Sequence, residues 1–272
     1  MNNSIETTDT GMELRDLLQD EAFAQRSKSS RSFQSEFDAL RRLTQVFAES
    51  PRILLQELVD IAVENCGADS AGISLEEQDD AGNMRFRWVA VAGSFSQYLN
   101  GTTPRFFSPC GTCLSSGRPQ LYTVTKPYYD FLGVVAEPIV DGMLIPWETD
   151  ASDSGERMRG TIWAVSQASS EAFGPEDYRL LRSLADFVAI AIRHQFQQQA
   201  LRQREREAAV ADKANQLAHQ INNPLQSLTN MLYIAREGKE NWQSYIEDAC
   251  QELESLSNLV RKLLSLKTED CR

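Results

Sequence analysis

The last third of the sequence restricts the fold most, because residues 175–272 carry a helical pattern throughout. Pro175 stands at a first helical position, and Glu176 and Asp177 follow it in the first turn, where acidic side chains favour a helix start. Residues 181–196 have an apolar face and are expected to pack on a globular domain, whereas residues 197–215 are polar and charged. A helix that leaves its domain in this way either bridges to another domain or pairs with a copy of itself.

Residues 210–272 predict a helical hairpin whose apolar residues lie on one side. At about 100° per residue, one stripe of the first helix contains Val210, Ala214, Leu217, Ile221, Leu228, Met231 and Ala235. The turn is expected at residues 236–241, and the second helix repeats Ile246, Leu253 and Val260 every seven residues. Two such helices cannot bury their stripes as an isolated pair, so the sequence predicts a homodimer that forms a four-helix bundle.

His219 is one of only two histidines, and it lies away from the apolar stripe. It falls about 200° from Leu217 on a helical wheel, so its ring is expected to point into solvent, with Asn223 one turn further along the same face. Pro224 removes the N–H that would bond to the carbonyl of Gln220, which costs roughly 3 kcal/mol in a helix interior. The sequence therefore predicts a kink beside an exposed histidine that another protein can approach.

Residues 33–197 mix helix and strand signals without strict alternation. Helices are expected from Phe33 to Pro51 and from there to Gly67, and strands at residues 71–78, 84–93, 119–124, 142–148 and 159–167. A polar loop between the last two strands indicates a hairpin. This order favours an α+β fold with an antiparallel sheet and helices on its faces. Residues 1–32 are polar and are expected to form a mobile tail.

The bulk properties exclude several classes of protein. A formal net charge of -12 argues against nucleic acid as a partner, because phosphate binding needs clustered lysine and arginine. No apolar run approaches the roughly 18 residues of a membrane span, and the N-terminus lacks the pattern of a signal peptide. Five cysteines, an odd number, fit a reducing compartment better than a disulfide framework. We expect a cytoplasmic protein.

Residues 218–228, AHQINNPLQSL, resemble the phosphoacceptor box of the dimerisation domain of two-component sensor histidine kinases (HisKA type). The resemblance covers roughly residues 205–270. It implies that His219 is the nucleophile that takes the γ-phosphoryl group of ATP and that Asn223 positions a water molecule for hydrolysis of a phosphorylated partner. In that family an acidic residue follows the histidine, but here Gln220 does. An amide can hydrogen-bond to the imidazole but cannot act as a base, so slower phosphorylation is expected.

The family's ATP-binding domain has no counterpart in these residues, since no glycine-rich nucleotide loop is found in the sequence. The resemblance therefore implies a phosphorelay protein that needs a separate histidine kinase or ATP-binding domain, and that exchanges phosphoryl groups with the receiver domain of a response regulator. Two alternatives remain open. The hairpin could be a non-catalytic dimerising regulator that binds a histidine kinase or a receiver domain, or the chain could be a truncated sensor histidine kinase. His194 lies in no motif, and no function is predicted for it.

Residues 33–197 resemble a GAF domain, a six-stranded antiparallel sheet with helices that often acts as a small-molecule sensor. Three segments carry the resemblance: residues 70–77, 108–123 and 160–192. The ligand is unknown. Residues 1–193 contain no histidine for haem, neither Cys110 nor Cys113 is followed by the histidine usual in bilin-binding relatives, and the cyclic-nucleotide pattern is absent. The two cysteines could form a redox pair or half a zinc site, but buried thiols are favoured, and no metal site is predicted.

The aromatic residues Phe86, Trp88, Tyr122, Trp147 and Trp163 are interpreted as sheet core rather than as a binding site. The sequence thus predicts a mobile tail over residues 1–32, a GAF-like sensor over 33–197, a helical linker over 198–209 and a phosphoacceptor hairpin over 210–272. The candidate catalytic residues are His219, Gln220 and Asn223. The expected partners are a second copy of the chain and a receiver domain or separate kinase, and no cofactor is evident.

Overall fold

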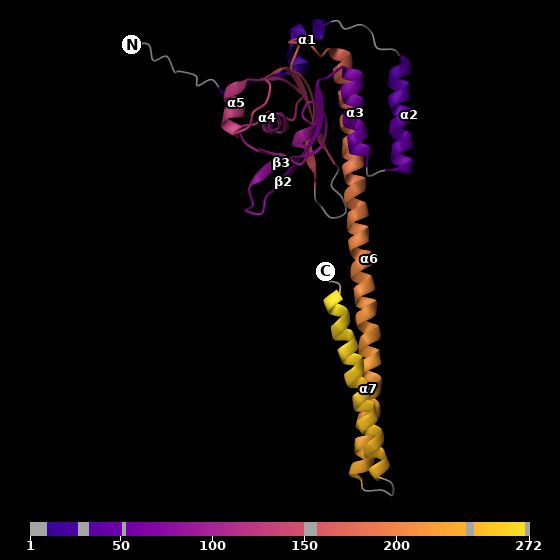
Figure 1. Cartoon of the computed structure of the whole chain (residues 1–272). Helices are drawn as coiled ribbons and strands as arrows, with labels where there is room; N and C mark the ends of the chain where they lie inside the picture. Colours follow the sequence, from indigo (N-terminus) through magenta and orange to yellow (C-terminus); the bar gives the residue numbers. More distant parts are fainter. Residues whose placement is uncertain (1–9, 27–32, 51–52, 150–156, 238–241, 270–272) are drawn as a thin grey trace, which may run out of the picture. The chain divides into compact units, whose positions relative to one another are not determined.

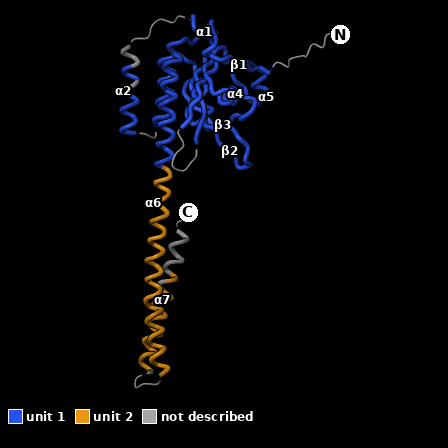
Figure 2. Tube along the Cα trace, turned by 180° about the vertical axis from the view of Figure 1, so that it is seen from behind, with its two compact units in different colours: residues 1–198 blue, residues 199–272 orange. Residues whose placement is uncertain are grey.

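The structure, a computed structural model, describes residues 10–26, 33–50, 53–149, 157–237 and 242–269. Its description excludes the side chains of residues 33–36, 40, 242, 259 and 262–269. The chain divides into two compact units, residues 1–198 and 199–272, which are coloured separately in Figure 2. Each unit is described on its own below.

The first unit is built on one antiparallel sheet, which confirms the predicted fold class. In the described residues seven strands pair in the order β1-β5-β6-β7-β2-β3-β4, and every pairing is antiparallel. The strands are β1 (Met12–Asp16), β2 (Ser70–Gln78), β3 (Met84–Gly93), β4 (Thr102–Pro104), β5 (Gln120–Val124), β6 (Ile139–Glu148) and β7 (Arg159–Ser166). The five predicted strands are all found, and the edge strands β1 and β4 are additional.

Two helices cover one face of the sheet, α3 (Leu54–Cys66) and the first part of α6 (Pro175–Arg236), and α2 (Phe33–Glu49) packs against α3 on the side away from the sheet. Gly67 ends α3 in the left-handed conformation at φ 61°, as its position in the sequence predicted. Fully buried side chains from α3, from the sheet and from α6 form one apolar core there, among them Leu58, Ile73, Ile162 and Leu181. His194 lies on α6 within this unit, with its ring centroid 5.5 Å from that of Phe47.

Shorter elements cover the other face of the sheet. These are the 3-10 helix η3 (Ser96–Tyr98), α4 (Pro109–Ser116) and α5 (Lys126–Leu132); Figure 1 shows α4 and α5 across the sheet from α3. A second core lies beneath them and is rich in aromatic side chains, including Phe86, Tyr122 and Trp163. The sheet therefore separates an aliphatic core from an aromatic one.

The expected mobile tail over residues 1–32 is wrong for the residues that the structure describes. Residues 12–25 form β1, the 3-10 helix η1 (Leu17–Gln19) and α1 (Glu21–Gln25), while residues 1–9 and 27–32 lie outside the described residues. β1 pairs with β5 at the sheet edge, and Leu17 and Phe23 are buried in the aliphatic core. The segment packs on the domain because a few of its apolar side chains are buried in the core, although its overall composition is polar.

The second unit is a pair of antiparallel helices, the remainder of α6 and α7 (Trp242–Glu269), which lie side by side in Figures 1 and 2. α6 is helical through Pro224 up to Arg236, and α7 begins at Trp242. The predicted turn falls between these two ends, with residues 238–241 outside the described residues. In the described part of the chain no helix combines the length and apolar character that crossing a membrane requires.

Candidate functional site

His219 lies on α6 in the second unit, and its side chain is exposed. On the helical wheel it falls about 180° from Leu228, which is the buried residue of α6 against α7. The ring therefore points away from the contact between the two helices. This is the orientation that the sequence predicted, and it leaves the imidazole free to meet a reacting group on another protein.

Gln220 and Asn223 are exposed beside His219, and Pro224 is half-buried. Asn223 lies one turn from His219 on the same face, whereas Gln220 is about 100° around the helix. Because Pro224 has no N–H, the carbonyl of Gln220 receives no backbone hydrogen bond from that position. Of these neighbours, Asn223 is therefore the one that shares the exposed face of His219.

The hairpin has two sets of apolar residues, one buried in the seam between its helices and one exposed beside that seam. On α7, the buried Ala249 and the half-buried Tyr245 and Leu256 lie on the helix-facing side. The predicted seven-residue repeat lies beside this seam and stays exposed: Ile246 by 39%, Leu253 by 57% and Val260 by 39%. The repeat is therefore not what holds the hairpin together.

Two residues of α6, Leu225 and Leu232, are exposed in the same way, by 43% and 56%. They lie about 50° to one side of Leu228, and the exposed residues of α7 lie to the corresponding side of Ala249. Because the two helices run antiparallel, the same angular offset on each helix places the exposed residues of α6 and those of α7 on one side of the hairpin. We call Leu225, Leu232, Ile246, Leu253 and Val260 the apolar strip; it has no partner within the described residues.

The first unit holds a cavity of about 270 Å³ on the aromatic face of its sheet. Two cross-strand pairs make its floor, each joining an aromatic residue to a glycine: Trp163 faces Gly72, and Tyr122 faces Gly142. A Cβ on Gly72 would lie 2.2 Å from the Trp163 ring, and one on Gly142 would lie 2.5 Å from the Tyr122 ring. The glycines therefore allow both rings to lie flat across the neighbouring strand.

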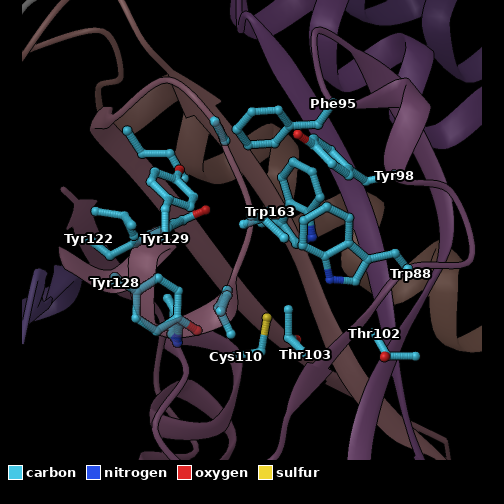
Figure 3. A pocket seen from close by; sticks show the side chains of 17 residues that line it. Trp88, Phe95, Tyr98, Thr102, Thr103, Cys110, Tyr122, Tyr128, Tyr129 and Trp163 are labelled. Carbon is cyan, nitrogen blue, oxygen red and sulfur yellow. The ribbon is translucent and has the colours of Figure 1, made fainter. Parts of the chain in front are cut away.

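Aromatic side chains also form the walls of the cavity. Tyr128 and Tyr129 come from α5, and Trp88 comes from β3 with its ring centroid 5.2 Å from that of Trp163. Phe95 and Tyr98, at η3, complete the cluster around Trp88. Figure 3 shows these rings around one space, with the three tyrosines of β5 and α5 facing Trp88 across it.

Four residues that line this cavity each carry a buried polar atom without a hydrogen bond to any described residue. These atoms are the indole nitrogen of Trp88, the hydroxyl of Thr103 and the hydroxyls of Tyr128 and Tyr129. Buried polar groups are normally satisfied, because an unmade hydrogen bond costs about 1–3 kcal/mol. Burial raises the pKa of both tyrosines, so their hydroxyls stay protonated near neutral pH. The apolar wall of the cavity thus contains hydrogen-bond donors that no described residue satisfies.

The cysteines of the CGTC segment lie on α4 rather than in a loop, and both are buried and free. Burial raises the pKa of each thiol, which disfavours the reactive thiolate. The Cys113 thiol donates to the carbonyl of Arg118 at 3.4 Å. In the described residues no group of three or more His, Cys, Asp or Glu side chains could hold a metal ion. These contacts support the interpretation as buried thiols.

The interpretation of five aromatic residues as sheet core is confirmed for the four that are buried in the two cores, and Trp88 packs half-buried against the aromatic core. Phe86 and Trp147 do not line the cavity. Trp88, Tyr122 and Trp163 line it as well, which the interpretation did not include. Sequence reasoning also missed the tyrosines of α5 and Tyr98. The available signal was the pairing of each floor aromatic with a glycine, but that pairing depends on strand register.

Known families match both units. The model of the GAF domain matches residues 50–192, more than half of the chain. The chain belongs to the GAF domain family. After this GAF domain, residues 212–271 match the model of the His Kinase A (phospho-acceptor) domain, which contains His219. Both predicted resemblances are confirmed. A GAF domain followed by a phosphoacceptor domain supports a histidine kinase-type signalling protein, and phosphoacceptor domains of this type usually dimerise.

Comparison with individual proteins adds only distant likeness. None of the curated proteins matches the sequence. The GAF domain of a phosphoenolpyruvate-protein phosphotransferase from Coxiella burnetii is 21% identical, and the match covers 61% of this chain and 98% of that one with a TM-score of 0.45. The GAF domain of an Acinetobacter phosphoenolpyruvate-protein phosphotransferase is 15% identical over 60% and 95%, with a TM-score of 0.43. The chromophore-binding domain of Stigmatella aurantiaca phytochrome P1 is 15% identical over 60% and 62%, also at 0.43.

Proposed function

We propose that this chain is a two-component phosphorelay protein, in which a GAF sensor controls phosphoryl transfer through His219 of a dimeric hairpin. The ATP-binding domain that supplies the phosphoryl group lies outside these 272 residues, and the acceptor is the receiver domain of a response regulator. The observation that carries the proposal is the exposure of His219 on the side of α6 opposite Leu228, inside the matched phosphoacceptor domain.

In this proposal His219 is the nucleophile. Its imidazole attacks the γ-phosphorus of ATP, the bond to the β-phosphate oxygen breaks, and ADP leaves while the ring nitrogen carries the phosphoryl group. Asn223, one turn away, orients a water molecule when the phosphorylated receiver domain is hydrolysed. Gln220 can hydrogen-bond to the imidazole but cannot take its proton, so positioning by the partner has to supply most of the rate.

The apolar strip supports the dimer. Five large apolar side chains lie 39–57% exposed on one side of a two-helix hairpin, and burying the exposed part of each against a second copy is worth roughly 1 kcal/mol. Since His219 lies on a different side of α6 from the strip, dimerisation through the strip leaves the imidazole accessible.

The test is phosphorylation by the histidine kinases of the same organism, purified and mixed one at a time with the full chain and radiolabelled ATP. We expect acid-labile, alkali-stable label in the chain with at least one kinase and none in His219→Ala. His194→Ala is the matched control and should be labelled like the wild type, because that ring packs against Phe47 within the first unit. No label with any kinase would contradict the proposal.

Gln220 favours a second candidate, a non-catalytic dimerising regulator that binds a histidine kinase or a receiver domain. The two candidates differ in cells. If the chain is a non-catalytic regulator, His219→Ala leaves the signalling output unchanged, whereas a charge in the apolar strip abolishes that output. If the chain transfers phosphoryl groups, both substitutions abolish the signalling output.

A further inference from the structure

We infer that the cavity of the GAF domain binds an uncharged, flat aromatic molecule that carries hydrogen-bond acceptors. The inference deepens the proposed function, because it gives the sensor a class of ligand. Binding is measurable without any phosphoryl transfer, so the two proposals can fail separately.

The lining of the cavity argues for an uncharged ligand. Seventeen residues line it, all within the described residues, and none of them carries a charge. The guanidinium of Arg105 lies nearby but is committed to the buried carboxylate of Glu76 and to the carbonyl of Gly111. A charge placed in this cavity would lose its hydration without gaining a partner, at a cost of several kcal/mol. Ligands whose phosphate or carboxylate groups must be buried are therefore disfavoured.

The walls argue for a flat, aromatic ligand. Trp163 and Tyr122 lie on the floor because their cross-strand partners are glycines, and Trp88, Tyr128 and Tyr129 stand around them. Aromatic faces and edges of this kind contact another ring in offset or edge-to-face geometry, which adds a favourable contribution beyond that of the buried area. The volume of about 270 Å³ is close to the lower end of small-molecule sites, which suits one or two fused rings.

The unpartnered atoms argue for acceptors on that ligand. The Trp88 indole nitrogen can only donate, and the protonated hydroxyls of Tyr128 and Tyr129 offer two further donors, joined by the hydroxyl of Thr103. A carbonyl oxygen has two lone pairs and can accept from two of these groups at once. An aromatic carbonyl compound thus satisfies both the walls and the donors, whereas a plain hydrocarbon satisfies only the walls.

A hydrogen bond joins two elements at the solvent side of the cavity. The loop between α5 and β6 contributes Val134 and Ala136 to the lining, and the carbonyl of Val135 between them accepts from the Tyr98 hydroxyl at 3.0 Å. Val135 is almost fully exposed, so this bond joins η3 to the loop at the solvent side of the cavity.

The test is isothermal titration calorimetry on the full chain with four probes. Coumarin and 1-indanone are uncharged and carry a carbonyl, coumarin-3-carboxylate adds a charge, and naphthalene lacks an acceptor. We expect saturable binding of at least one of the two carbonyl probes below millimolar concentration. We also expect affinity at least about tenfold weaker for naphthalene and no binding of the carboxylate. Absence of binding for both carbonyl probes, or equal binding of the carboxylate, would overturn the inference.

Two matched variants locate the binding. Tyr129→Phe removes only the hydroxyl and should weaken binding of the carbonyl probe about 3- to 10-fold while leaving naphthalene unchanged. Tyr178→Phe makes the same change on α6 outside the cavity and should leave both probes unchanged. Unaltered binding of the carbonyl probe to Tyr129→Phe, or equal losses in the two variants, would place the ligand elsewhere and refute the inference.

Discussion

Single residues decide both candidate sites, and they do so through position rather than through unusual chemistry. His219 is exposed because its place in the helical repeat puts it opposite Leu228. In the GAF domain, Gly72 and Gly142 decide where the rings of Trp163 and Tyr122 lie, since a Cβ at either glycine would overlap the ring. A substitution at one of these glycines would displace the cavity floor before it affected any ligand contact.

Gln220 gives a prediction at this scale. Gln220→Glu places a carboxylate next to His219, at the position where the histidine kinase family has an acidic residue. Because a carboxylate can accept the imidazole proton and an amide cannot, we expect the rate of His219 phosphorylation to rise about tenfold or more. The measurement is the initial rate of label incorporation with the same kinase.

Gln226→Glu is the control for charge alone. It adds the same charge on the exposed side of α6 about two turns away and should leave the rate unchanged. Equal rates for Gln220→Glu and the wild type would show that residue 220 takes no part in proton transfer.

Among the elements, the N-terminal segment shows how a polar stretch is held by a few contacts. β1 pairs with β5, and Arg26, directly after α1, reaches the buried Asp141 of β6 at 2.8 Å and the carbonyl of Phe173 at 3.0 Å. The side chains of Arg26 and Asp141 are only 12% and 4% exposed. The segment therefore closes the sheet edge with a buried ion pair, although the GAF family match begins only at residue 50.

Arg26→Ala should destabilise the GAF domain, because it leaves the Asp141 carboxylate buried without its cation. We expect the free energy of unfolding to fall by about 3 kcal/mol at neutral pH, measured by urea denaturation. Arg15→Ala breaks a much more exposed pair with Asp20 and should cost less than about 1 kcal/mol. Similar losses in the two variants would contradict a special role for the buried pair.

The cost of Arg26→Ala should also depend on pH. Burial raises the pKa of Asp141 even though Arg26 opposes the shift, and removing Arg26 raises it further. A raised pKa in the folded state means that stability is lost as pH rises through it, so the deficit of the variant is largest at neutral pH. We expect the deficit to shrink as pH falls from neutral, because Asp141 then becomes protonated and no longer buries a charge.

For the whole molecule, the apolar strip is the feature that a single chain leaves unsatisfied. Leu253→Glu should keep the hairpin folded, since Leu253 is 57% exposed and lies outside the seam of Ala249. In a symmetric dimer the change acts twice, so we expect the dissociation constant of the dimer to rise about 100-fold or more, measured by analytical ultracentrifugation.

Gln251→Glu introduces the same charge on the opposite side of α7 and is the control. It should leave the dimer intact. A hairpin that stays monomeric in the wild type, or a dimer that tolerates Leu253→Glu, would contradict association through the apolar strip.

The sequence by itself determined the features that depend on the hydrophobic periodicity of one element or on a short sequence motif. Helical periodicity and the Pro175 and Gly67 boundary signals located the long helices, and alternation located the five central strands. The helical-wheel angle from Leu217 placed His219 on the exposed side of α6. Such signals are local because an amphipathic face is defined within a few turns of one element.

Only the tertiary structure decided which residues from distant elements meet. It showed that β1 belongs to the sheet, that the seven-residue repeat of α7 lies beside the hairpin seam, and that three of the predicted core aromatics also line a cavity. The cavity depends on strand register, which pairs Gly72 with Trp163 and Gly142 with Tyr122 across positions far apart in the chain. Register is set by the packing of whole faces, and a shift of one residue would turn every one of these rings to the other side of the sheet.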